Sequence, residues 1–218
     1  MNLIYNDHPN IPATIRTAFL QKVTSIAAYL QIDPNWLMQV MYSESRLKAS
    51  AQNVQGGRLI AAGLLQWTKA SGVIGAPQSI LQYDHLRQLD FVQQYFTPYR
   101  GRMHSYFDVY LVTFFPAAVG QSDDYVFATN KLSASLIAQQ NPAVNIVKDG
   151  KITMAEFKQY VWNSTPAGVR GLIFKVQQAI EDVTQDAKTV IATATENPGA
   201  TAITGIATIL AFFLSSAA

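Results

Sequence analysis

Glu44 is the residue whose surroundings in the sequence favour acid–base chemistry. Leu37, Val40 and Met41 precede it by seven, four and three residues, so on a helix all four side chains lie on one stripe. A charge on a core-facing stripe costs free energy unless it has a partner or a function. An apolar pocket raises the pKa of a carboxyl, as a general acid near neutral pH requires. The structural alternative is a boundary carboxylate paired with Arg46.

The segment that follows Glu44 contains no acidic residue from Ser45 to Tyr83. Its polar groups are amides, glycines and hydroxyls, which suit neutral ligands rich in hydroxyl and amide groups, such as sugars. Ordinary glycosidases use two carboxylates at the scissile bond, so the acid-free segment agrees with a mechanism that needs only one. Three aspartates further along the chain could still reach the site through folding: Asp84, Asp90 and Asp108.

Two short motifs resemble a known family. Glu44-Ser45 at the end of an apolar helix, followed by Gly63-Leu64-Leu65-Gln66, resembles the E-S…G-L-M-Q signature of lytic transglycosylases with a goose-lysozyme-like fold. Over residues 20–160 the chain is more specifically similar to the transglycosylase-like lysins of bacteriophage. The resemblance implies a mainly α, lysozyme-like domain that cleaves the MurNAc–GlcNAc bond of peptidoglycan. It also implies that Glu44 protonates the leaving oxygen, then serves as base while the muramyl 6-hydroxyl closes a 1,6-anhydro ring.

The same resemblance implies roles for three residues near Glu44. Ser45 and Gln66 would orient Glu44 or bind the sugar, and Gly63 would let the glycan-facing turn pack closely. The alternative for Gly63 is purely structural, because glycine most often serves backbone geometry. For Ser45 and Gln66 the structural and the substrate-binding interpretations both stay open.

The third motif of the cellular family is absent. That motif, Y-N-A-G, corresponds here to Phe115-Pro116-Ala117-Ala118, which has neither hydroxyl nor amide. Either Tyr110 or another tyrosine replaces the missing contact with Glu44, or Glu44 lacks it. Phe115 is a candidate for lining the substrate cleft, with a place in the core as the alternative.

Composition limits the remaining classes of function. The chain has 218 residues, of which 49% are hydrophobic and 14% charged, against about 25% charged in an ordinary soluble protein. It has no cysteine, which excludes disulfides and cysteine-based metal sites. A net charge of +2 is too weak to indicate a nucleic-acid partner, and we expect none. The expected partners are peptidoglycan glycan strands.

Helical periodicity and start signals predict a mainly α domain over residues 1–165. Asp33-Pro34 is a helix-start pair, with a capping carboxylate followed by proline. The apolar run over 108–115 fits a strand or a buried helix, and its helical neighbours favour the helix. The expected elements are helices over 15–31, 34–48, 82–99 and 108–115, a polar loop over 49–63, and a short apolar helix from about 63.

Residues 145–156 match the skeleton of a calcium loop, with Gly150 at position six and Glu156 at position twelve. Asn145 and Asp149 occupy two further ligand positions, but Val147 at position three has no ligand atom. The interpretation is therefore a structural turn that launches a helix near residue 153. We expect no cofactor and no metal, with calcium on these residues as the weaker alternative.

The C-terminal part of the chain is predicted to be an appendage. Residues 166–196 form an amphipathic helix, and residues 197–218 form an uncharged apolar tail that is either membrane-seeking or packed against a virion protein. With the family resemblance, this predicts a virion-associated or lysis enzyme acting in the bacterial periplasm or cell wall. The alternatives are a hydrolytic muramidase and a non-catalytic structural or glycan-binding virion protein.

Overall fold

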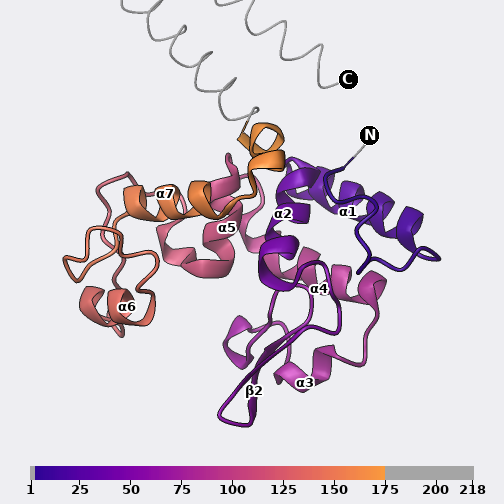
Figure 1. The fold of residues 1–218 in the computed structure, drawn as a ribbon, viewed down its shortest axis with the longest axis horizontal. Coiled ribbons are helices and arrows are strands. Elements are labelled where there is room, and N and C mark those ends of the chain that lie inside the picture. Colours follow the sequence, from indigo (N-terminus) through magenta and orange to yellow (C-terminus); the bar gives the residue numbers. More distant parts are fainter. Residues whose placement is uncertain (1–2, 175–218) are drawn as a thin grey trace, which may run out of the picture. The chain divides into compact units, whose positions relative to one another are not determined.

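The structure, a computed structural model, describes residues 3–174, and this part is mainly helical (Figure 1). The described residues up to Ile173 belong to one compact unit. The elements follow in chain order: α1 (Arg16–Leu30), α2 (Pro34–Ser45), β1 (Gln52–Gln55), β2 (Arg58–Ala62), η1 (Lys69–Ser71), α3 (Pro77–Ile80), α4 (His85–Phe96), η2 (Thr97–Tyr99), α5 (Tyr106–Phe114), η3 (Pro116–Ala118), α6 (Ala134–Gln140) and α7 (Met154–Ser164). The predicted mainly α class is confirmed.

The first two helices confirm the pair predicted over 15–31 and 34–48. α2 begins where expected, because the Asp33 carboxylate accepts a backbone N–H at 2.7 Å and Pro34 occupies the first turn. It ends at Ser45, three residues early, because Arg46 adopts a left-handed backbone with φ of 55°. Glu44 therefore lies in the last turn of α2.

The loop predicted over 49–63 is wrong, because these residues contain an antiparallel hairpin of β1 and β2. Gly56 and Gly57 form its turn, with φ of 56° and 75°. β1 is polar and fully exposed, and β2 is buried only at Ala61 and Ala62, so neither strand shows the alternation that would identify a half-buried strand. The short helix predicted from about residue 63 is also wrong. Residues 63–66 form a turn, closed by two backbone hydrogen bonds between Ala62 and Trp67 of 3.2 and 2.8 Å.

Gln88 of α4 holds the segments around this turn together, although it is completely buried. Its Oε1 accepts the Leu64 backbone N–H at 2.9 Å. Its Nε2 lies 2.8, 3.2 and 3.0 Å from three backbone carbonyl oxygens, those of Ala49, Ile80 and Tyr83. One side chain thus replaces the secondary structure that this irregular region lacks.

The later helices confirm the predictions over 82–99 and 108–115, with the second as a helix rather than a strand. α3 and α6 are additional short helices. α7 begins after Thr153, as predicted, with a capping box between Thr153 and Glu156. Residues 167–174 are helical, but the rest of the predicted helix over 166–196 and the whole tail over 197–218 lie outside the described residues. No helix within residues 3–174 is long and apolar enough to span a bilayer.

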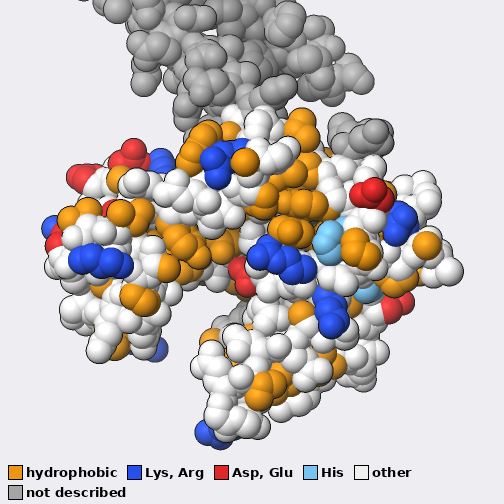
Figure 2. Space-filling model, in the orientation of Figure 1, with side chains coloured by type: hydrophobic (Ala, Val, Ile, Leu, Met, Phe, Trp, Pro, Cys, Tyr) orange, Lys and Arg blue, Asp and Glu red, His pale blue; other side chains and the backbone are white. Residues whose placement is uncertain are grey.

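Two lobes frame the C-terminal end of α2. The hairpin lobe comprises residues 49–83, with the hairpin and α3, and the helical lobe comprises residues 106–164, with α5 to α7. α2 packs against α1 and α5 and lies between the two lobes (Figure 1). The molecular surface is hollowed between them (Figure 2).

Candidate active site

Glu44 carries a carboxyl group with an altered proton affinity. Burial raises its pKa from 4.5 to about 7, and a hydrogen bond with the Thr113 side chain opposes this rise. None of the ion pairs within residues 3–174 involves Glu44. The guanidinium carbon of Arg46 instead lies 4.5 Å from the centre of the Tyr42 ring. The alternative of a Glu44–Arg46 pair is therefore wrong, and the carboxyl exchanges its proton near neutral pH.

The charge of Glu44 affects the pKa of three tyrosines. Burial and this charge both raise the pKa of Tyr95, Tyr106 and Tyr110, that of Tyr95 to about 12. Tyr110 packs between the rings of Tyr106 and Phe157, with centroid distances of 6.0 and 5.9 Å. The replacement of the missing contact by Tyr110 stays a prediction, because the charge of Glu44 influences Tyr110 while the hydrogen bond to Glu44 comes from Thr113.

Thr113 of α5 is the hydrogen-bond partner of Glu44 that sequence reasoning missed. Its hydroxyl also lies 2.8 Å from the Tyr110 carbonyl oxygen, an ordinary contact for threonine within a helix. Thr113 is two residues before the F-P-A-A segment, so the position of the absent Y-N-A-G motif pointed to the correct region. The available signal was a hydroxyl on an otherwise apolar helix.

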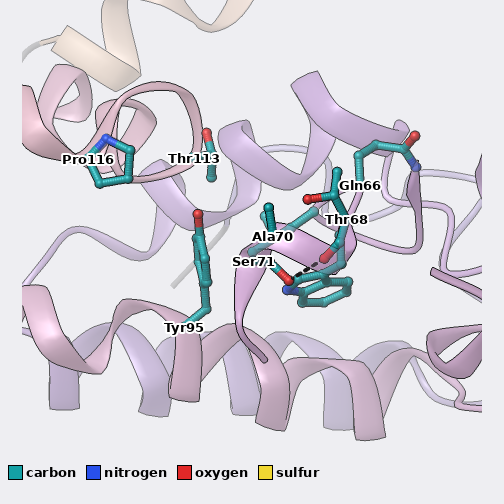
Figure 3. Close-up of a pocket in the computed structure, with 9 residues that line it drawn as sticks. Gln66, Thr68, Ala70, Ser71, Tyr95, Thr113 and Pro116 are labelled. Carbon is teal, nitrogen blue, oxygen red and sulfur yellow. Dashed lines mark hydrogen bonds between the residues drawn. The ribbon is translucent and has the colours of Figure 1, made fainter. Parts of the chain in front are cut away.

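A cavity of about 240 Å³ adjoins Thr113 and opens between the two lobes. Tyr95 points its hydroxyl toward Thr113 and Pro116 on one side, and Gln66, Thr68, Ala70 and Ser71 lie on the other (Figure 3). Both lobes and α4 contribute to its lining: Leu65, Gln66, Trp67, Thr68, Ala70, Ser71, Tyr95, Thr113 and Pro116. No charged side chain is among them.

Two polar groups of the lining residues differ in whether they have a hydrogen-bond partner. The Ser71 hydroxyl donates to the Thr68 carbonyl oxygen at 2.7 Å, so its lone pairs remain free to accept. The indole N–H of Trp67 is buried and has no hydrogen-bond partner within residues 3–174. A buried donor without a partner costs about 1–3 kcal/mol, which a carbonyl or hydroxyl oxygen of a ligand would recover. The Ser71 hydroxyl is thus an acceptor at the cavity wall, and the Trp67 indole N–H is a buried donor in a residue of the same wall.

The G-L-L-Q turn forms one wall through its backbone. Gly63 has φ of 81°, and a Cβ there would lie 2.8 Å from the Gln88 Oε1 and 3.0 Å from the Trp67 ring, so only glycine fits. Gln66 lines the cavity, yet its own Nε2 donates to the Gly63 carbonyl oxygen at 3.2 Å. Both residues shape the turn, and Gln66 also faces the cavity.

Ser45 is buried and joins α2 to this turn. Its hydroxyl lies 2.9 Å from both the Met41 and the Leu64 carbonyl oxygens. This geometry gives Ser45 a positioning role between the helix that bears Glu44 and the cavity wall. Both carbonyl oxygens compete for its one proton, so the hydroxyl has no proton left to donate to a sugar.

Phe115 occupies the core instead of the cavity. It is 8% exposed, and its ring stacks on Phe127 with centroids 4.8 Å apart. Its neighbour Pro116 lines the cavity in its place. The lining role predicted for Phe115 is thus corrected, because the aromatic cluster with Phe127 provides better burial than the cavity edge.

The other aspartates considered from sequence are engaged away from Glu44. Asp84 accepts the Arg87 backbone N–H at 2.8 Å and caps α4. Asp90 pairs with Lys22 at 2.6 Å, and Asp108 accepts the backbone N–H of His104 at 2.8 Å. Glu44 itself is not among the residues that line the cavity, but its hydrogen-bond partner Thr113 is. Within the described residues Glu44 is therefore the carboxyl that is hydrogen-bonded to the cavity wall.

The calcium-like loop is closed by hydrogen bonds. Glu156 accepts the backbone N–H groups of Val147 and Thr153, both at 2.9 Å. Burial alone would raise the pKa of Glu156, but these hydrogen bonds bring it below the ordinary value. Asp149 lies 3.6 Å from Lys151, and the Asn145 Oδ1 is buried without a partner in the described chain. The position-twelve carboxylate thus already has donors on both oxygens.

This arrangement combines one protonatable carboxyl, a hydroxyl that orients it and an uncharged polar cavity between two lobes. Such a set can donate a proton to a bound neutral ligand and take one back. Searches of protein-family models, curated proteins and solved structures find no match to this chain.

Proposed function

We propose that the protein cleaves the β-1,4 bond between MurNAc and GlcNAc in peptidoglycan as a lytic transglycosylase with a lysozyme-like fold. The observation that carries the proposal is the Glu44 carboxyl, whose pKa burial raises to about 7 and whose hydrogen-bond partner Thr113 lines an uncharged cavity. A general acid is most effective when its pKa lies near the working pH. The polar wall of the cavity suits the hydroxyl and acetamido groups of a glycan strand.

The reaction needs one carboxyl in two protonation states. Protonated Glu44 donates its proton to the glycosidic oxygen as the bond from that oxygen to C1 of MurNAc breaks. The 6-hydroxyl of the same MurNAc then bonds to C1, and its proton returns to the Glu44 carboxylate. No water is consumed, and the products are a GlcNAc-terminated strand and a 1,6-anhydro-MurNAc end. Thr113 holds the carboxyl in place, and the tyrosines around it exclude bulk water.

The test compares wild type with Glu44→Gln on isolated sacculi, with the released fragments identified by mass. We expect wild type to release anhydro-MurNAc products and the variant to release none. Asp149→Asn is the matched control, because it also neutralises one carboxylate but lies on the surface. Equal solubilisation by wild type and Glu44→Gln would refute the proposal. Reducing MurNAc ends without anhydro forms would assign a hydrolytic muramidase instead.

A second candidate is a glycan-binding virion component without turnover. The F-P-A-A segment favours it, since this segment brings neither hydroxyl nor amide to Glu44 and Phe115 lies in the core. Tight binding of wild type to sacculi without released fragments would support this candidate. In both cases we place the protein at the bacterial cell wall, delivered with a virion.

A further inference from the structure

Arg46 presents a positive charge beside the site without using it in the fold. None of the ion pairs within residues 3–174 includes Arg46, whose side chain is exposed. Its Nη1 donates to the Tyr42 carbonyl oxygen at 3.3 Å, and its guanidinium stacks on the Tyr42 ring. Because a guanidinium has five N–H donors in a rigid fork, most of them remain for a ligand.

Arg46 follows Glu44 by two residues and is the C-cap of α2, at the end of the helix that the two lobes frame. Burial and the Glu44 charge raise the pKa of Tyr110, and the Arg46 charge opposes that rise. The charges of Glu44 and Arg46 therefore shift the pKa of the same hydroxyl in opposite directions. It is not among the groups that change the pKa of Glu44 itself. The two charges border one site, and each remains available.

The Tyr42 ring holds the guanidinium in a defined orientation. Tyr42 is itself fixed by Tyr5, whose ring stacks on it at a centroid distance of 4.1 Å. The Tyr5 hydroxyl in turn donates to the Gln39 Oε1 at 2.8 Å. A cation stacked on a fixed ring loses less conformational entropy when it binds a planar anion.

The surrounding charge also favours an anion. Besides Arg46, the exposed cations Lys48 and Lys69 of the acid-free segment belong to none of the ion pairs in the described chain. Basic side chains lie near α2 at the inner end of the hollow (Figure 2). Exposed basic side chains raise the local concentration of anionic ligands.

We propose that Arg46 binds a carboxylate of the peptide stem attached to MurNAc, so that the protein prefers peptide-bearing glycan to bare glycan. This inference rests on the proposed function, which places a glycan strand in the neighbouring neutral cavity. The sugar rings of that strand carry no charge, whereas its peptide stems carry carboxylates. The planar fork of Arg46 matches a carboxylate in bidentate geometry.

The test measures binding in the Glu44→Gln background, so turnover is not needed. The ligands are soluble glycan strands with their peptide stems and the same strands after the stems have been removed by an amidase. We expect Glu44→Gln to bind the stem-bearing strands about fivefold more tightly, as one charge-assisted contact at a partly exposed site contributes. Adding Arg46→Gln should abolish that preference, while adding Arg58→Gln on the hairpin should preserve it.

Arg46→Gln is a compatible substitution, because this protein already places glutamine in left-handed backbone at Gln31 and Gln66, with φ of 62° and 49°. Equal affinity of Glu44→Gln for both kinds of strand would overturn the inference and leave the proposed cleavage standing. So would a preference that survives Arg46→Gln or that falls equally with Arg58→Gln. A retained stem preference in a wild type that releases no fragments would overturn the cleavage instead. Binding to neither kind of strand would overturn both.

Discussion

Replacing Glu44 by glutamine should stabilise the protein at alkaline pH and leave its stability nearly unchanged at acid pH. Burial raises the pKa of Glu44 in the folded protein to about 7. Between this value and 4.5, the Glu44 carboxyl is therefore protonated in the folded protein but ionised in the unfolded chain. The stabilising protonation is fully present below 4.5, the ordinary pKa, and is lost as the pH rises through 7. Above that range the folded wild type carries a buried charge at Glu44, and the glutamine variant carries none.

The magnitude follows from the two pKa values. The difference between 4.5 and about 7 corresponds to about 3 kcal/mol, since a tenfold change in proton affinity is about 1.4 kcal/mol. This is an upper bound, because the side chain keeps some contact with solvent. Urea denaturation at about pH 5 and about pH 9 measures the free energy of unfolding of both proteins. Fluorescence reports on the compact unit, which contains all three tryptophans: Trp36, Trp67 and Trp162.

The control is Glu156→Gln, which should behave in the opposite way. Hydrogen bonds hold the pKa of Glu156 below its ordinary value despite burial, so its charge stabilises the fold above that value. The stability is lost as the pH falls through the folded-state pKa, and the variant should approach wild type only at acid pH. A Glu44→Gln variant whose stability relative to wild type is the same at both pH values would refute the reasoning.

Three further substitutions test the supports of the site. Gln88→Met should lower the free energy of unfolding by about 3 kcal/mol or more, because it removes four hydrogen bonds to backbone groups around the turn, including those of the buried Leu64 N–H and Ala49 carbonyl. Urea denaturation measures this, with the exposed Gln94→Met as control. Gly63→Ala should cost about 2 kcal/mol or more in the same assay, since its Cβ would lie 2.8 Å from the Gln88 side chain at φ of 81°. Thr113→Val removes a hydrogen bond that lowers the pKa of Glu44, so the alkaline limb of the pH profile for sacculus cleavage should move to higher pH. Thr113→Ser, which keeps the hydroxyl, should leave that limb in place, and an unmoved limb in the valine variant would contradict the assigned contact.

Local signals predicted the element that carries Glu44. Asp33 and Pro34 mark the start of α2, and the apolar stripe that ends at Glu44 identifies its buried face. Both features act within a few residues along the chain, so a single sequence contains them. The acid-free segment after Glu44 likewise indicated an uncharged cavity.

The sequence was a poor guide where long-range contacts decide the structure. The turn over 63–66 depends on Gln88, which is far along the chain, and nothing in the sequence around Gln88 indicates that it binds this turn. Thr113 reaches Glu44 only because α5 packs against α2. The hairpin over 52–62 is buried only at Ala61 and Ala62, which are adjacent and so produce no periodic pattern. Each of these features follows from a tertiary contact that composition and spacing do not contain.

The base of the hairpin lobe is held by hydrogen bonds to α2 and α4, whereas its tip is exposed. An isolated two-stranded hairpin is only marginally stable in water, and β1 is exposed along its whole length. At the base, Ser45, Gln88 and the Ala62–Trp67 bridge anchor the turn to α2 and α4. Amide protons of the hairpin should therefore exchange with solvent far faster than those of the turn. Under the proposed function, a glycan strand that enters the hollow would displace the tip of the hairpin and leave the anchored turn in place.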